Sequence, residues 1–126
     1  MPGPIKGIKV LELAQIMAGP TCGLLLADLG AEVIKIEKIP GGDDTRRFVP
    51  PEVHGESAAF MQMNRNKKGM ALDLKKPEGV AVFKRLVKNA DIVIENFRKG
   101  TMEKLGLGYD NLKKFNLKFI FGELQG

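Results

Sequence analysis

The chain has 126 residues, which is enough for one globular domain with an ordinary hydrophobic core. Hydrophobic residues make up 44% of it and charged residues 28%, values that are typical of a soluble globular protein and exclude a disordered one. The net charge of +5 favours anionic partners, but the 15 acidic residues are interspersed with the basic ones, so a phosphate-bearing small molecule fits at least as well as a nucleic acid.

Two further absences in the sequence bear on where the protein works. No apolar run approaches the roughly 20 residues that span a membrane, and the first residues lack the apolar stretch of a secretory signal. Cys22 is the only cysteine, so an internal disulfide is impossible and a reducing compartment is expected. We therefore predict a cytoplasmic protein that does not bind a membrane.

The first elements in chain order form a strand–helix–strand unit. An apolar-rich run predicts a strand over residues 8–13, and leucine and alanine at helical spacing predict a helix over residues 21–29 that ends at Gly30. A second strand is predicted over residues 33–37. A crossover helix of this length makes the two strands parallel.

The middle of the chain begins with an irregular segment. Proline and glycine leave little room for a regular element in residues 38–57, and an ordered loop this long is usually functional or covered by a partner. A helical turn is predicted over residues 58–64 and a third strand over residues 70–73. Residues 77–89 give the clearest helical pattern, with apolar side chains on one face and basic ones on the other.

The last third repeats the alternation of strands and helices. We predict a strand over residues 91–95, short helices over 101–105 and 109–115, and a last strand over 117–121. A helix start at Thr101 is expected from its capping hydroxyl. The whole pattern predicts an α/β fold, a Rossmann-like, mostly parallel sheet with helices on both faces.

Basic side chains follow several of the predicted strands. Because the carboxyl ends of parallel strands meet at one edge of a sheet, these side chains are expected to converge there and to bind phosphates, and they are Lys38, Lys75, Arg98, Lys99 and Lys104. Residues 64–79 join a basic loop, a strand and a proline-opened helix, which predicts cations and free amides at one strand end. A solvated lysine-rich turn is the alternative interpretation.

Residues 19–23 (GPTCG) stand where the first strand meets the first helix, and both a ligand contact and a structural turn fit them. They match neither the dinucleotide fingerprint nor a Walker loop. Cys22 as a nucleophile would need a base, and the only histidine is His54 in the irregular segment, so a buried, inert thiol is expected. Those two side chains are also too few for a metal site.

Two polar residues near strand ends need partners. Asp73 is expected within an apolar strand, where a carboxylate requires a hydrogen-bond partner. Asn96 follows a strand and has an amide that can reach a ligand and nearby backbone together.

A series of short motifs covers nearly the whole chain from residue 5 onward. They are residues 7–13 (GIKVLEL), 18–20 (AGP), 26–37 (LADLGAEVIKIE), 42–46 (GDDTR), 64–68 (NRNKK), 72–75 (LDLK), 77–79 (PEG), 90–97 (ADIVIENF) and 105–109 (LGLGY). In this order the motifs resemble the class III CoA-transferases of CaiB–BaiF type, a family that also contains the alpha-methylacyl-CoA racemases.

The resemblance implies CoA-thioester chemistry on a Rossmann-like domain, in a homodimer whose subunits interlock. It implies that CoA is held by Met17, Ala18, Lys38, Leu72, Asp73, Leu74, Lys75, Asn96, Phe97, Arg98 and Lys104. Lysine at positions 38 and 104, where arginine is common in the family, keeps the charge but loses the bidentate fork. Met17 stands where some formyl-CoA transferases carry glutamine, a departure from the residue associated with oxalate chemistry.

The resemblance also implies that the catalytic residues of the family have no counterpart within residues 1–126. Transferases of the family move CoA between carboxylic acids through an aspartyl intermediate, and the racemases use a histidine and an aspartate at the carbon alpha to the thioester. In the family those residues lie beyond the position that matches Gly126, so no catalytic residue is assigned. Residues 1–126 are expected to be the incomplete, N-terminal CoA-binding part of the domain and to be inactive alone.

The expected ligand is CoA or acyl-CoA, with no metal and no nucleic acid. An acyl-CoA racemase and a non-catalytic CoA-binding module remain as alternatives, and a nucleic-acid-binding domain is a third. The last is disfavoured because base stacking needs exposed aromatic rings, whereas Phe83, Phe119 and Phe121 are expected in the core.

Overall fold

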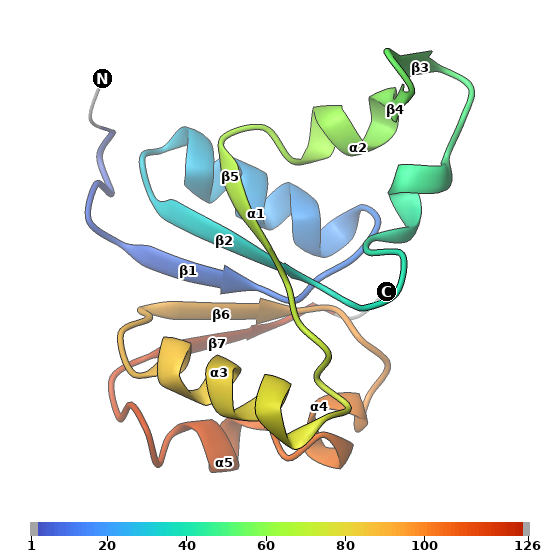
Figure 1. The fold of residues 1–126 in the computed structure, drawn as a ribbon. Coiled ribbons are helices and arrows are strands. Elements are labelled where there is room, and N and C mark those ends of the chain that lie inside the picture. The colour runs from blue at the N-terminus through green and yellow to red at the C-terminus, as the bar shows by residue number, and fades with distance from the viewer. Residues whose placement is uncertain (1–2, 125–126) are drawn as a thin grey trace.

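A five-stranded sheet in the order β5-β2-β1-β6-β7 forms the centre of the structure, a computed structural model that describes residues 3–124 (Figure 1). Every neighbouring pair in this sheet is parallel. The strands are β1 (Lys9–Glu12), β2 (Glu32–Glu37), β5 (Lys67–Ala71), β6 (Ile92–Glu95) and β7 (Ile120–Glu123). The predicted α/β fold with a mostly parallel sheet is confirmed.

Helices cover both faces of the sheet, as predicted (Figure 1). One face carries α1 (Ala18–Asp28), with α2 (Ala58–Met63) beside it, and the other carries α3 (Pro77–Val87). Two single-turn helices, α4 (Thr101–Lys104) and α5 (Tyr109–Leu112), lie on the same side as α3. None of the helices that the described residues form is long and apolar enough to cross a bilayer.

The alternation of side chains along β1 divides the core into two clusters. Leu11 and Leu13 point to the α3 side and pack with Phe83, which is completely buried. Val10 points to the α1 side and packs in a second cluster with Ala27. A strand with buried side chains on both faces is what a parallel sheet between two helical layers requires.

The third and fifth strands of the sheet differ from the predicted bounds. The third, β5, begins at Lys67 and ends at Ala71 rather than covering residues 70–73, so Asp73 lies beyond the strand. Its start is displaced because the Lys67 ammonium is paired and buried, which lets a charged residue enter the strand.

The last strand, β7, covers Ile120–Glu123 rather than residues 117–121. Asn116 causes the shift, because its side-chain amide donates to the carbonyls of Val87 and Ala90 and its oxygen accepts from Lys118 N. These hydrogen bonds hold the preceding segment in a turn.

Two other predicted elements are corrected at their starts. Helix α1 begins at Ala18, so Gly19 lies in its first turn, where a Cβ atom would come within 2.0 Å of the Ala14 Cβ. Gly100, with a positive φ of 87°, takes the cap position that Thr101 was expected to fill.

The segment after β2 is more ordered than predicted. It contains the 3-10 turn η1 (Asp44–Arg47) and a small hairpin of β3 (Glu52–Val53) and β4 (Glu56–Ser57). This segment extends from the carboxyl end of β2 toward α2 (Figure 1).

Candidate functional site

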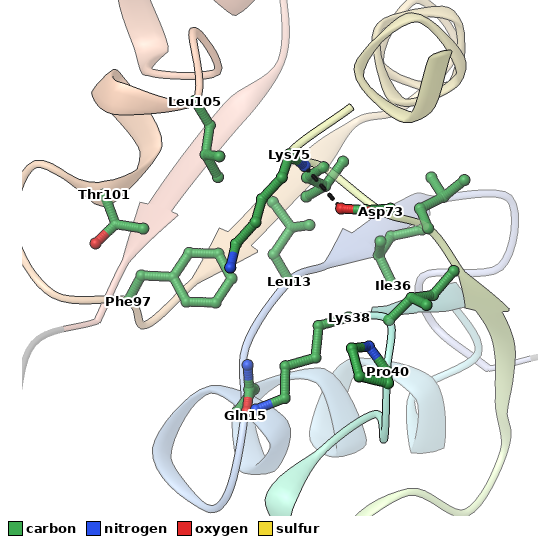
Figure 2. Close-up of a pocket in the computed structure, with 13 residues that line it drawn as sticks. Leu13, Gln15, Ile36, Lys38, Pro40, Asp73, Lys75, Phe97, Thr101 and Leu105 are labelled. Carbon is green, nitrogen blue, oxygen red and sulfur yellow. Dashed lines mark hydrogen bonds between the residues drawn. The ribbon is translucent and has the colours of Figure 1, made fainter. Parts of the chain in front are cut away.

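A pocket of about 370 Å³ lies at the carboxyl edge of the sheet, where the loops that follow β1, β2, β5 and β6 meet (Figure 2). Open parallel sheets usually bind their ligands at this edge. The lining side chains come from all four loops, from the end of β2 and from α4 with the residue that follows it, and they are Leu13, Gln15, Ile36, Lys38, Ile39, Pro40, Leu72, Asp73, Leu74, Lys75, Phe97, Thr101 and Leu105.

The walls of the pocket combine an apolar surface with two cations. Leu72, Leu74 and Phe97 form apolar walls, and all three also pack against the α3-side core. Lys38 and Lys75 reach the pocket from the loops that follow β2 and β5 (Figure 2). An apolar surface with a few convergent charged groups is typical of a small-molecule site.

A tight turn after β5 sets the position of Lys75. The Asp73 carboxylate accepts a hydrogen bond from Lys75 N at 3.0 Å, and the Asp73 carbonyl accepts one from Lys76 N (Figure 2). Gly79 allows α3 to start against this turn, because a Cβ atom there would come within 2.0 Å of the Asp73 carbonyl oxygen. The hydrogen-bond partner that the sequence predicts for the Asp73 carboxylate is therefore a backbone N–H group of its own turn.

Lys38 shares a carboxylate with a second cation. Its Nζ lies 2.9 Å from Asp44 Oδ1, and the Arg47 guanidinium binds the same oxygen. The hydrogen bond from Lys38 is the main cause that lowers the pKa of Asp44 below its usual range, with Arg47 adding to it. Two cations around one oxygen form a local excess of positive charge beside the pocket.

Asn96 stands behind the pocket rather than in its lining. Its Oδ1 accepts from Gln15 N at 2.9 Å, and its Nδ2 donates to the Gln15 carbonyl at 2.8 Å. The amide therefore reaches nearby backbone, as the sequence predicted, and it holds a loop whose Gln15 lines the pocket.

The structure brings together part of the predicted site. Six of the predicted residues line the pocket: Lys38, Leu72, Asp73, Leu74, Lys75 and Phe97. The other predicted residues lie outside the lining, namely Met17, Ala18, Asn96, Arg98, Lys99 and Lys104. All of these except Asn96 are exposed.

One predicted convergence is wrong. Lys67 and Lys68 stand at the amino end of β5 and Lys75 beyond its carboxyl end, so the basic loop at 64–68 and the helix start at 77 lie at opposite ends of the strand. Strand direction separates them, because a parallel strand carries the chain across the full width of the sheet.

Several lining residues were missed by the sequence analysis. Leu13, Gln15, Ile36, Ile39, Pro40, Thr101 and Leu105 were not predicted as site residues. The available signal was the position of these residues in the sequence. Leu13 and Gln15 come just after β1, and Ile36 and Ile39 lie at the end of β2. This is the edge where a parallel sheet places its ligands.

A buried ionic network beneath the site was also missed. Lys35 Nζ donates to Glu12 Oε2 at 2.9 Å and lies 2.9 Å from Asp43 Oδ2. On the other side of Glu12, Lys67 Nζ lies 2.7 Å from Oε1. All four side chains are at most 3% exposed, and the two positive and two negative charges balance, as burial of ions requires.

Burial acts on the pKa values within this network. Burial alone would raise the pKa of the Asp43 carboxyl, but hydrogen bonds from Lys35 and Thr45 outweigh it and hold the pKa below its usual value. Burial lowers the pKa of the Lys67 ammonium, although its partner Glu12 opposes the shift. The alternation of side chains along β1 predicts an apolar residue at position 12, which points to the α1-side core. The pattern therefore does not predict a buried ion pair at Glu12.

Helix α1 is shaped to cover the network. A Cβ atom on Gly23 would come within 1.8 Å of Glu12 Oε1, so only glycine leaves room for that carboxylate. Burial, followed by the charge of Glu12, raises the pKa of the neighbouring Cys22 thiol. A thiol with a raised pKa is a weak nucleophile, which agrees with the inert cysteine expected from the sequence.

Comparisons with known proteins agree on one family. The family model described as CoA-transferase family III matches residues 5–126. The succinate–glutarate CoA-transferase of Agrobacterium fabrum is 49% identical over 98% of the chain, and the human succinyl-CoA:glutarate CoA-transferase is 41% identical over 98%. A solved CAIB/BAIF family protein from Brucella suis matches 100% of the chain at 45% identity with a TM-score of 0.94.

The chain spans about a third of the length of these relatives. The match covers 32% of the Agrobacterium fabrum protein, 28% of the human one and 34% of the Brucella suis chain.

Proposed function

This chain belongs to CoA-transferase family III, and we propose that it forms the CoA-binding N-terminal part of an enzyme that transfers CoA between carboxylic acids. The pocket at the carboxyl edge of the sheet is the proposed CoA site. No catalytic residue is assigned within residues 1–126. The proposed enzyme passes the acyl group through an aspartyl intermediate that another part of the polypeptide supplies.

The proposal rests on one observation: Lys38 and Lys75 both line a pocket whose walls are otherwise largely apolar. CoA combines a flat adenine ring with three phosphate groups, so it needs apolar contact beside positive charge. Phe97, Leu72 and Leu74 supply apolar contact for the ring, and the two lysines supply charge-assisted hydrogen bonds for phosphate oxygens.

The predicted residues outside the lining have a place in the same proposal. Met17 and Ala18 are exposed at the start of α1, and Arg98 and Lys104 are exposed around α4. We assign them to parts of CoA that extend beyond the pocket. Asn96 acts in this proposal by holding Gln15 at the pocket wall.

The relatives suggest the class of acyl group. The Agrobacterium fabrum and human proteins are named for succinate or succinyl-CoA with glutarate, and we propose a short dicarboxylic acyl-CoA as substrate here. We further propose a cytoplasmic homodimer. An acyl-CoA racemase is the second candidate, because the family resemblance covers both activities and the residues that separate them lie outside this chain.

Titration calorimetry of the protein with CoA tests the proposed site. Lys38→Ala and Lys75→Ala should each weaken binding roughly tenfold or more, the range that a charge-assisted hydrogen bond contributes. Lys88→Ala is the matched control, because Lys88 caps the far end of α3 and lies outside the pocket lining. Failure to bind CoA, or equal affinities for all four proteins, would overturn the assignment.

A second measurement separates the candidate activities. The enzyme that contains this chain is incubated with succinyl-CoA and free glutarate, and glutaryl-CoA is followed by chromatography. Transfer of CoA supports the transferase. Exchange of the proton alpha to the thioester in deuterated water, without transfer, would favour the racemase instead.

A further inference from the structure

The backbone of Gln15 and Ile16, between β1 and α1, is held from two sides. Asn96 binds both the N–H and the carbonyl of Gln15, at 2.9 and 2.8 Å. Asp43 accepts from Ile16 N, at 3.1 Å to Oδ1 and 3.3 Å to Oδ2. Asn96 comes from the loop after β6 and Asp43 from the loop after β2, so two distant segments fix one peptide.

Ile16 has a backbone conformation that needs such support. Its φ is +70°, in the left-handed region that β-branched residues rarely adopt. Its side chain is 40% exposed, so packing of that side chain does not explain the conformation. Non-glycine residues keep a positive φ only where the surrounding structure holds them there, and such residues cluster at ligand sites.

Asp43 is itself fixed by a rigid environment. The residue is 1% exposed, its Oδ1 accepts from both Thr45 N and Thr45 Oγ1 at 2.9 Å, and its Oδ2 faces Lys35 Nζ at 2.9 Å. Lys35 also donates to the Ala14 carbonyl at 3.0 Å, one residue before Gln15. The buried ion pair therefore touches the β1–α1 loop at two points.

The same carboxylate links two walls of the pocket. Gln15 lines the pocket from the β1–α1 loop, and Lys38 and Pro40 line it from the loop that leads to Asp43. Asp43 N also donates to Glu37 Oε1 at 2.9 Å, which closes that second loop on the end of β2. Asp43 itself is outside the lining, so its contact with the pocket runs through these two loops.

We propose that Asp43, held by Lys35, is a positioning residue that keeps Ile16 in its left-handed conformation and thereby sets the β1–α1 loop for CoA. The inference rests on the proposed function of the pocket. The buried pair is thus more than a stabilising contact of the core. When the hydrogen bonds between Asp43 and Ile16 N are weakened, the β1–α1 loop samples other conformations. The apparent affinity for CoA then falls in proportion to the fraction of molecules whose loop keeps the binding conformation.

The decisive test is a cycle of variants that uses the backbone preference of Ile16. Asp43→Asn keeps the size of the side chain but removes its charge and one acceptor, and we expect CoA binding to weaken about tenfold, within the cost of an unsupported left-handed residue. Ile16→Gly removes the backbone strain, since glycine adopts a positive φ freely. The double variant should therefore regain most of the lost affinity.

A purely structural Asp43 gives a different pattern. Asp43→Asn lowers stability in either case, but with a purely structural Asp43 the added change Ile16→Gly would leave the CoA affinity of Asp43→Asn unchanged. Asp91→Asn is the matched control, because Asp91 accepts a backbone N–H from Lys9 at 2.8 Å at the opposite end of the sheet, and its CoA affinity should equal that of the wild type. Circular dichroism establishes that each protein is folded at the temperature of titration.

Amide hydrogen exchange of the wild-type protein keeps the test independent of any variant. The Ile16 amide should exchange slowly although the residue is exposed, because a buried carboxylate holds its hydrogen. Free exchange at Ile16 overturns the proposal even if Asp43→Asn does not fold. If the Ile16 amide of the wild-type protein exchanges slowly but the protein does not bind CoA, the proposed function is overturned instead. The role of Asp43 in CoA binding is then overturned as well.

Discussion

Lys38 Nζ lies 2.9 Å from Asp44 Oδ1, so the cation assigned to CoA phosphate is already paired within the protein. Arg47 binds the same oxygen. The carboxylate occupies the place between two cations that a phosphate oxygen would take, and it competes with the ligand for them.

Asp44→Asn should therefore tighten CoA binding. The amide keeps an acceptor oxygen but no longer neutralises Lys38, and we expect the dissociation constant at low salt to fall about two- to fivefold, the range of an exposed ion pair. The gain should shrink in 0.5 M salt because exposed charges are screened. Titration calorimetry at two salt concentrations measures both effects.

Asp110→Asn provides the comparison for this variant. Asp110 pairs with Lys113 at 3.2 Å on α5, outside the pocket lining, so its loss removes the same charge away from the site. Weaker binding in Asp44→Asn would contradict the prediction and would mean that the carboxylate orients Lys38 for the ligand.

Gly23→Ala should destabilise the fold. The added methyl group would meet Glu12 Oε1 at 1.8 Å and Cδ at 2.9 Å, within a buried carboxylate that Lys35 and Lys67 hold on both sides. We expect a loss of about 1–3 kcal/mol in the free energy of unfolding, as for other overpacked cores. Urea denaturation followed by circular dichroism measures the change.

Gly69→Ala is the matched glycine substitution. A Cβ atom at Gly69 has open space around it, and its φ is not positive. Alanine there should leave stability unchanged or raise it by a few tenths of a kcal/mol, through the lower entropy of the unfolded chain. Equal stabilities of the two variants would mean that α1 can move away from Glu12 at little cost.

Acid should destabilise the protein through Asp43 and Glu37. Burial would raise the pKa of Asp43, but hydrogen bonds from Lys35 and Thr45 outweigh it and hold the pKa below its usual value, and the hydrogen bond from Arg46 lowers the pKa of Glu37. A carboxyl whose pKa is lowered in the folded state stabilises that state fully above the unfolded pKa and loses this contribution as the pH falls through the folded pKa. The free energy of unfolding should therefore decline below about pH 5.

Asp43→Asn isolates one part of this dependence. Because asparagine does not titrate, the variant should lose less stability between pH 5 and pH 3 than the wild type, although it starts lower. Urea titrations at intervals over that range give the two slopes. Parallel curves would show that the pKa of Asp43 is the same in the folded and unfolded states.

Glu95→Gln should stabilise the protein at neutral pH. Burial, helped by the charges of Glu123 and Glu103, raises the pKa of the Glu95 carboxyl, and the side chain is 3% exposed. A raised carboxyl pKa means that the stability contribution is lost as the pH rises through the folded pKa. Glutamine removes the buried charge and can still accept the hydrogen bond from Phe97 N.

The gain from Glu95→Gln should depend on pH with a definite sign. It should be largest at pH 7–8, where the carboxyl is ionised in the unfolded state, and should become small near pH 4, where the wild-type carboxyl is mostly protonated in both states. Thermal unfolding at the two pH values measures it. A loss of stability at pH 8 would mean that the ionised carboxylate has a stabilising role at the end of β6.

Much of the candidate site follows from sequence order alone. Lys38 and Lys75 follow strands that the apolar pattern predicts, and a parallel arrangement brings their strand ends to one edge. Asn96 was expected to reach backbone, and it binds Gln15. Arg98 and Lys104 are predicted at the same edge from their positions in the sequence, but they lie outside the pocket lining. The conformation of each loop decides which side chains near the strand ends point into the pocket.

The bounds of two strands show where local patterns fail. Lys67 begins β5 despite its charge because Glu12, more than 50 positions away in the sequence, neutralises it. Ile120 begins β7 because Asn116 ties the preceding segment to the end of α3. In both cases a partner distant in the sequence overrides the local preference.

The sequence by itself determined the fold class and the edge of the sheet that carries the pocket, because hydrophobic periodicity and the succession of strands and helices are local properties of the chain. Its short motifs carried the resemblance to the family. Only the tertiary structure decided that Glu12, Lys35, Asp43 and Lys67 form one buried network. The same is true of the support that Asp43 gives to the strained peptide at Ile16. The physical reason is that a charge can be buried only beside its partner, and that pairing depends on how strands and loops meet in space.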